Sequence, residues 1–92
     1  MALIINKTQT IGFAIDDHGE LKTPKYFEES MKISTQAKQV LKVIVKHCIT
    51  KNELEIPMQI FRDLLEKELP LNIKTVSALI ELKTNNYIDI NI

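Results

Sequence analysis

The sequence predicts an α+β fold, and three patterns along its 92 residues support that prediction. Strand-forming residues gather at the two ends of the chain, at 2–6 and 87–90. Apolar residues between them recur at the three- and four-residue spacing of amphipathic helices. The last third then orders a helix over 57–69, a sharp turn, a second helix over 72–83 and the final strand. This order is typical of a winged helix-turn-helix with a small antiparallel sheet.

The first part of the chain, residues 1–20, is expected to add an N-terminal β-hairpin to that sheet. Residues 2–6 would form one strand, and residues 10–16 alternate between apolar and small or polar side chains as a second strand does. Lys7-Thr8-Gln9 would be the tight connection between them. The sequence Asp-Asp-His-Gly at 16–19 then predicts a turn, because Asp accepts local backbone hydrogen bonds and Gly permits positive φ.

Helical signals fill the remaining core, which is expected over residues 21–92 of a single domain (1–92) with a C-terminal wing strand. Thr23 before Pro24 predicts the cap of a short helix. Ser34 is expected to cap the next helix, which has the clearest periodicity in the chain and which Lys51-Asn52 is expected to end. Its apolar stripe must face a core. The stripe consists of Ala37, Val40, Leu41, Ile44, Val45 and Cys48.

The C-terminal helix over 72–83 determines which side chains a partner would meet. Asn85-Asn86 is expected to end it, because asparagine tolerates left-handed backbone. Its inward positions are expected to be Ile73, Val76, Leu79 and Ile80. Its outward positions would be Asn72, Lys74, Thr75, Ser77, Ala78 and Glu81. The final strand has no later partner in the sequence, so the N-terminal hairpin or residues 53–56 should pair with it.

The charge of the chain neither requires nor excludes a nucleic-acid partner. Twelve Lys and Arg balance twelve Asp and Glu, whereas a domain that binds DNA through its phosphates usually has a basic excess. Residues 34–56 hold four lysines against two glutamates, a local excess of two positive charges. Three of these lysines, Lys38, Lys42 and Lys46, follow one another at four-residue spacing. An anionic partner would explain this stripe, and so would a merely solvated helix face.

Residue types that carry catalysis or bind metals do not converge in the sequence. His47 and Cys48 are adjacent, but a metal site needs three or four ligands, and Cys48 falls on the apolar stripe. Turn and cap roles explain Asp16-Asp17 and Glu28-Glu29 better than acid-base catalysis does. We therefore expect no enzyme, no cofactor and no metal site. A lone cysteine and the lack of a long apolar segment favour a cytoplasmic protein without a membrane segment.

Short segments between Leu21 and Ile90 match the pattern of a known family. They are Leu21-Lys-Thr-Pro-Lys-Tyr-Phe, Ile33-Ser-Thr-Gln-Ala-Lys-Gln-Val-Leu, and Ile73-Lys-Thr-Val-Ser with Leu82-Lys-Thr-Asn-Asn-Tyr-Ile. In these segments the chain resembles the N-terminal winged-helix domain of plasmid and phage replication initiators, which implies DNA binding. Asn86 stands where that family usually has glycine. The interval from Val76 to Tyr87 is also one residue short, so the helix either ends early or is rotated.

Two functions of different classes follow from these patterns. The first is DNA binding in phage or plasmid replication or transcription control, by a homodimer that uses the N-terminal strands as its interface. Contacts to duplex DNA would come from Asn72, Lys74, Thr75, Ser77, Lys83 and Asn85, and further phosphate contacts from Lys38, Lys42 and Lys46. The second is a winged helix that binds a protein instead, for example a phage factor that redirects a host protein. Zero net charge, a single arginine and an outward Glu81 favour the second.

Overall fold

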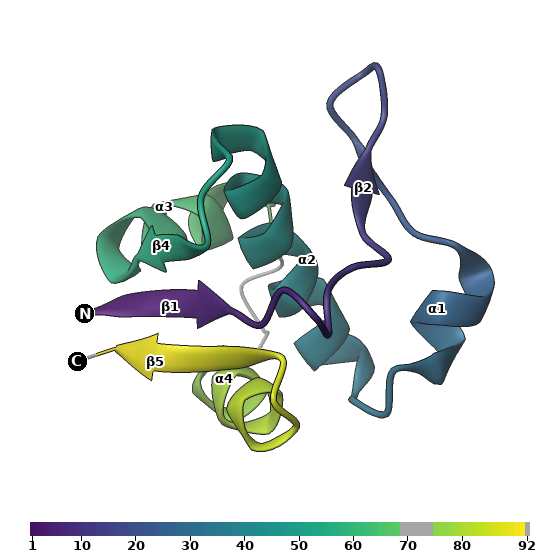
Figure 1. Cartoon of the computed structure of the whole chain (residues 1–92). Coiled ribbons are helices and arrows are strands. Elements are labelled where there is room, and N and C mark those ends of the chain that lie inside the picture. The colour runs from purple at the N-terminus through teal and green to yellow at the C-terminus, as the bar shows by residue number, and fades with distance from the viewer. Residues whose placement is uncertain (69–74, 92) are drawn as a thin grey trace.

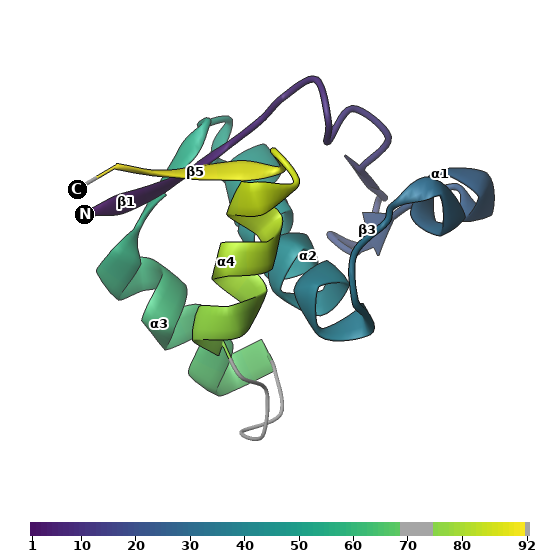
Figure 2. The same ribbon diagram turned by 90° about the horizontal axis from the view of Figure 1, so that it is seen from below.

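The computed structural model describes residues 1–68 and 75–91, which form the predicted mixture of helices and strands. The elements are β1 (Ala2–Ile5), β2 (Ala14–Ile15), β3 (Leu21–Lys22), α1 (Lys25–Ser30), α2 (Thr35–Lys51), β4 (Glu55–Pro57), α3 (Met58–Glu68), α4 (Thr75–Thr84) and β5 (Ile88–Asn91). Figures 1 and 2 show α2 in the middle of the molecule, with the termini at one end and α1 at the other. No helix among the described residues combines the length and hydrophobicity that crossing a bilayer requires.

β1 is the central strand of a three-stranded antiparallel sheet, between β4 and β5 (Figure 1). Leu3 lies opposite Ile56 of β4 on one side and Ile90 of β5 on the other. β1 and β5, from the two ends of the chain, are therefore neighbours, so the N-terminal segment, and not residues 53–56, pairs with the final strand. Because both edges of β1 are occupied, this strand has no free edge for the expected homodimer interface.

The N-terminal hairpin has different strands from those that the sequence indicates. β2 pairs with β3, not with β1, so the predicted pairing of 2–6 with 10–16 is wrong. The cause is a series of tight turns after β1, in which the Thr10 hydroxyl donates to the carbonyl of Asn6 at 3.0 Å. The turn predicted at 16–19 is present: the Asp16 carboxylate accepts hydrogen bonds from the backbone N–H groups of His18 and Glu20, both at 2.9 Å.

α2 forms the centre of the hydrophobic core, and its ends are where the sequence indicates. The Ser34 hydroxyl accepts a hydrogen bond from the N–H of Ala37 at 3.2 Å, so Ser34 is the N-cap. After Lys51, Asn52 adopts left-handed backbone with φ 54° and its N–H donates to the last turn. The whole predicted stripe is buried, together with Val43. Side chains from the sheet and the other helices pack against it, and the largest are Leu3, Ile56, Phe61 and Leu82.

An aromatic contact and an ion pair between Lys42 and Glu28, and not a buried face, attach α1 to the rest of the protein. No residue of α1 is buried. The Phe27 ring meets the Phe13 ring edge to face, with centroids 5.4 Å apart and an interplanar angle of 86°. A Cβ at Gly12 would lie 2.5 Å from the Phe27 ring, so this approach requires glycine. The predicted Thr23 cap is wrong, because α1 begins after Pro24 and no side chain caps it.

The thiol of Cys48 is expected to react slowly with alkylating reagents. Its side chain is 1% exposed, and burial, with a smaller effect of the Glu53 charge, raises its pKa from 9.0 to about 11. Because the thiolate is the nucleophile, iodoacetamide at pH 8 should modify the folded protein far more slowly than the urea-unfolded chain. The folded state also favours the protonated thiol over the thiolate. The raised pKa of Cys48 therefore adds to the free energy of unfolding below pH 9, and this addition is lost as the pH rises toward 11. Equal modification rates in the two states, measured by mass spectrometry, would contradict this prediction.

Candidate interaction surface

α4 turns a different face to the core from the one that the sequence indicates. Its buried residues are Ala78, Leu79 and Leu82, with exposed fractions of 3%, 9% and 0%. Val76 and Ile80, both expected to point inward, are 72% and 60% exposed. The predicted register is therefore wrong at Val76 and Ile80, and Ala78 is not an outward residue.

Glu81 explains part of this rotation, because its carboxylate binds the N-terminus of α2. It accepts hydrogen bonds from the backbone N–H of Ser34 and, at 2.8 Å, from the Ser34 hydroxyl. Ser34 caps α2, where unpaired backbone N–H groups and the helix dipole favour a negative charge. Glu81 is half-buried against α2, so its predicted outward position is also wrong. The side of α4 that carries Val76 and Ile80 then faces away from the core.

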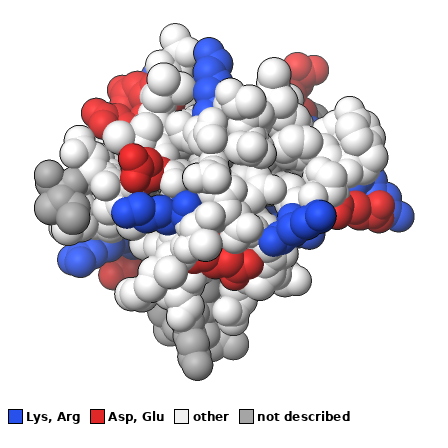
Figure 3. Space-filling model, turned by 60° about the horizontal axis from the view of Figure 1, so that its bottom comes forward, with Lys and Arg blue, Asp and Glu red and all other residues white. Residues whose placement is uncertain are grey.

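We name the exposed set Val76, Ser77, Ile80, Lys83 and Thr84 the outer face of α4. Val76 and Ile80 lie one helical turn apart, and Lys83 follows almost a turn later on the same side. In Figure 2, which views the molecule from below, α4 lies in front of α2. Figure 3 shows the molecular surface from a similar direction. Uncharged side chains cover the middle of this side of the molecule, and charges of both signs are scattered around them (Figure 3). Because Val76 and Ile80 are both exposed one turn apart, the outer face is apolar at its centre.

Among the described residues, those expected to contact DNA share their side of α4 with apolar side chains. Asn72 and Lys74 lie outside the described residues. Thr75 is half-buried, while Ser77, Lys83 and Asn85 are exposed. The Asn85 side-chain amide donates to the carbonyl of Glu81 at 2.9 Å, so it helps to end α4, and Asn86 follows with a left-handed φ of 64°. Between the exposed members of the set lies the apolar pair Val76 and Ile80.

The lysine stripe of α2 faces acidic side chains of the same protein. Lys42 forms an ion pair with Glu28 of α1, and Lys46 lies 4.0 Å from Glu20. The hydrogen bond from Lys42 holds the pKa of Glu28 below its usual value, and the charges of Lys42 and Lys38 add to this effect. The stripe therefore helps to position α1 and the β2–β3 turn, and much of its charge is neutralised within the fold.

The described part of the chain offers no metal site beside this surface. No three His, Cys, Asp or Glu side chains converge there closely enough to hold a metal ion. No protein-family model, curated protein or solved structure matches this chain. The resemblance to replication initiators therefore stays a prediction from the sequence, and the outer face of α4 has to be interpreted from its own chemistry.

Proposed function

We propose that this protein is an interaction module that binds a partner protein through the outer face of α4. The observation that carries the proposal is the exposure of Val76 and Ile80, which are neighbours on a helix that otherwise packs on the core. Burying an aliphatic side chain of this size contributes about 1.5–3 kcal/mol relative to leaving it exposed. A pair of them can therefore supply the apolar centre that a protein interface needs.

The positive charge of Lys83 beside Val76 and Ile80 indicates which charge the partner would carry. Lys83 flanks the apolar centre, and no acidic side chain among the described residues forms an ion pair with it. The partner would therefore present an apolar hollow for Val76 and Ile80 and a carboxylate opposite Lys83. Duplex DNA has phosphates that could pair with Lys83, but it offers no apolar hollow for Val76 and Ile80, because its grooves are lined mainly by polar base edges.

An Ile80→Asp variant is expected to lose the partner while keeping the fold. Introducing a charge at the apolar centre removes the burial energy and adds an unpaired carboxylate to the interface. Tagged protein would be purified from the cells that produce it naturally, and bound proteins would be quantified by mass spectrometry. A specific protein should be strongly depleted with Ile80→Asp. Thermal unfolding should show little change, since surface substitutions usually alter stability by about 0.5 kcal/mol or less.

Ile11→Asp is the matched control, because Ile11 is 81% exposed and lies in the turns after β1, not on α4. The same charge at this position should leave the partner bound. If every associated protein is recovered equally with both variants, the outer face of α4 is not the binding surface.

DNA binding is the second candidate, and the position of α4 favours it. α4 follows α3, is exposed along one side and leads through Asn86 into β5, which is the order expected of a recognition helix. A salt titration with random duplex DNA separates the two candidates. The interaction module should not bind duplex even at low salt. DNA binding predicts an affinity that falls steeply with salt and is lost in Lys83→Glu.

A further inference from the structure

A hollow on another side of the molecule has the chemistry of a small-molecule site. It lies between the turns after β1 and the C-terminal end of α2, has a volume of about 380 Å³, and opens to solvent. This volume is at the small end of the range for ligand pockets, which is roughly 300–1,000 Å³. None of its lining residues belongs to α4. Any ligand of this hollow is therefore independent of the function proposed above.

Most of the residues that line the hollow are apolar, and several of these apolar side chains are exposed. Phe13, Val45 and Cys48 are the buried apolar residues of the lining, and the polar residue Thr10 is buried there too. The rim is formed by Ile11, Ile49 and Leu54, which are 81%, 38% and 53% exposed. Isolated exposed apolar residues are normal on a protein, but three around one concavity indicate a surface that a ligand covers.

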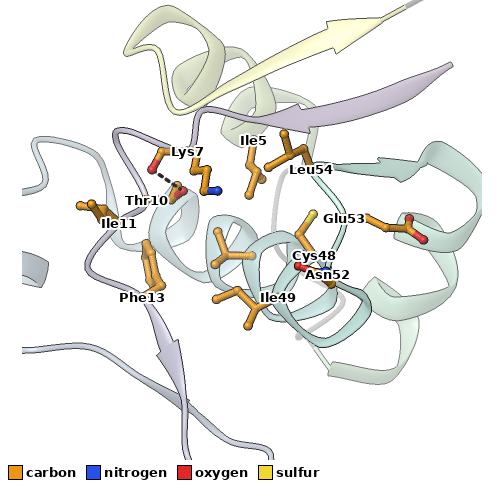
Figure 4. Close-up of a pocket in the computed structure, with 11 residues that line it drawn as sticks. Ile5, Lys7, Thr10, Ile11, Phe13, Cys48, Ile49, Asn52, Glu53 and Leu54 are labelled. Carbon is orange, nitrogen blue, oxygen red and sulfur yellow. Dashed lines mark hydrogen bonds between the residues drawn. The ribbon is translucent and has the colours of Figure 1, made fainter.

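A lysine, Lys7, lies at the edge of the hollow. The Lys7 side chain extends between Thr10 and Ile5 at its edge (Figure 4). No acidic side chain among the described residues forms an ion pair with Lys7. Glu53 also belongs to the lining, but it is directed away from the other labelled side chains (Figure 4). Lys7 can therefore pair with an anionic head group at this edge of the hollow, away from the Glu53 carboxylate.

We propose that this hollow binds a small amphipathic carboxylate, with its hydrocarbon chain against the apolar walls and its head group on Lys7. A chain of medium length suits the modest volume, and an ammonium forms a charge-assisted hydrogen bond with a carboxylate. The Cys48 thiol acts as an apolar part of the wall, because burial keeps it protonated. No covalent chemistry is involved.

Decanoate, used below the concentration at which it forms micelles, is the probe. Titration into the methyl-labelled protein should shift the NMR signals of Ile5, Ile49 and Leu54 and leave those of Val76 and Ile80 unchanged. Decanol, which has the same chain and no charge, should bind the same residues more weakly. The proposal is overturned if decanoate shifts none of the lining methyl groups, or if decanol binds as tightly as decanoate.

A Lys7→Glu variant tests the head-group contact. It should weaken decanoate binding by about tenfold or more, because an attractive charge becomes a repulsive one, and it should leave decanol binding unchanged. Lys32→Glu makes the same change of net charge at an exposed lysine that does not line the hollow, and should bind decanoate like the wild type. Equal decanoate affinity in Lys7→Glu and Lys32→Glu would refute the assignment of Lys7.

Discussion

Replacing Leu3 with alanine is expected to lower the free energy of unfolding by about 2–5 kcal/mol. Leu3 is fully buried at the middle of β1, with β4 on one side and β5 on the other. Truncating it leaves a cavity where the sheet meets α2, and the surrounding backbone is fixed by pairing on both edges. The site can therefore relax little, which favours a cost toward the upper end of the range.

A loss of this size is a large part of the total stability. A domain of 92 residues is held by roughly 5–14 kcal/mol, at about 0.05–0.15 kcal/mol per residue. For a chain of this length each kcal/mol lowers the melting temperature by about 4–8 °C. Calorimetry or urea unfolding followed by circular dichroism would measure the change.

Ile11→Ala is the control for Leu3→Ala, since both remove a large aliphatic side chain and Ile11 is 81% exposed. It should change the free energy of unfolding by about 0.5 kcal/mol or less. If Leu3→Ala is no more destabilising than Ile11→Ala, β1 is not the central strand of the sheet in solution.

Removing the Glu81 carboxylate is expected to lower the free energy of unfolding by about 1–2 kcal/mol. The loss is smaller than for a fully buried charged hydrogen bond, because Glu81 is partly exposed to solvent. Glu81→Ala loses both hydrogen bonds from Ser34 and the favourable charge at the N-terminus of α2. Ser34→Ala should cost a similar amount, because it removes the cap of α2 as well as the hydroxyl that donates to Glu81. Urea unfolding of each variant gives the two values.

The double variant shows whether the two residues act together. Because they share these hydrogen bonds, a double-mutant cycle should give a coupling energy of at least about 0.5 kcal/mol. Glu66→Ala is the matched control, since Glu66 is an exposed glutamate on α3, and it should show no coupling with Ser34→Ala. Additive effects of Ser34→Ala and Glu81→Ala would mean that this contact does not hold α4 against α2.

Features that depend on neighbouring residues could be predicted from the sequence. Ser34 and Asn52 indicate where α2 begins and ends. Its apolar stripe is narrow enough that only one face of the helix can point inward. The turn after β2 follows in the same way from Asp16. In each case a side chain satisfies backbone groups only a few positions away, so the information is local.

Strand pairing could be predicted only in part. The lack of a later partner for β5 left the N-terminal hairpin and residues 53–56 as candidates, and the N-terminal strand β1 is the one that pairs with it. The hairpin partner of β1 was predicted wrongly, because the residues that follow β1 fold into tight turns stabilised by Thr10, and β4 takes the place of the expected strand. Strand-forming composition does not identify the partner, since any free edge can supply the same backbone hydrogen bonds.

The sequence by itself determined that α4 exists, roughly where it ends, and that it is apolar on more than one side. Val76, Leu79, Ile80 and Leu82 cover so much of its circumference that two rotations about the helix axis bury a comparable amount of apolar surface. Only the tertiary structure decided between them. Glu81 reaches a helix N-terminus 47 residues away in the chain, and the small side chain of Ala78 lies in the core. Contacts so distant in sequence leave no local pattern, and they determine that Val76 and Ile80 face outward.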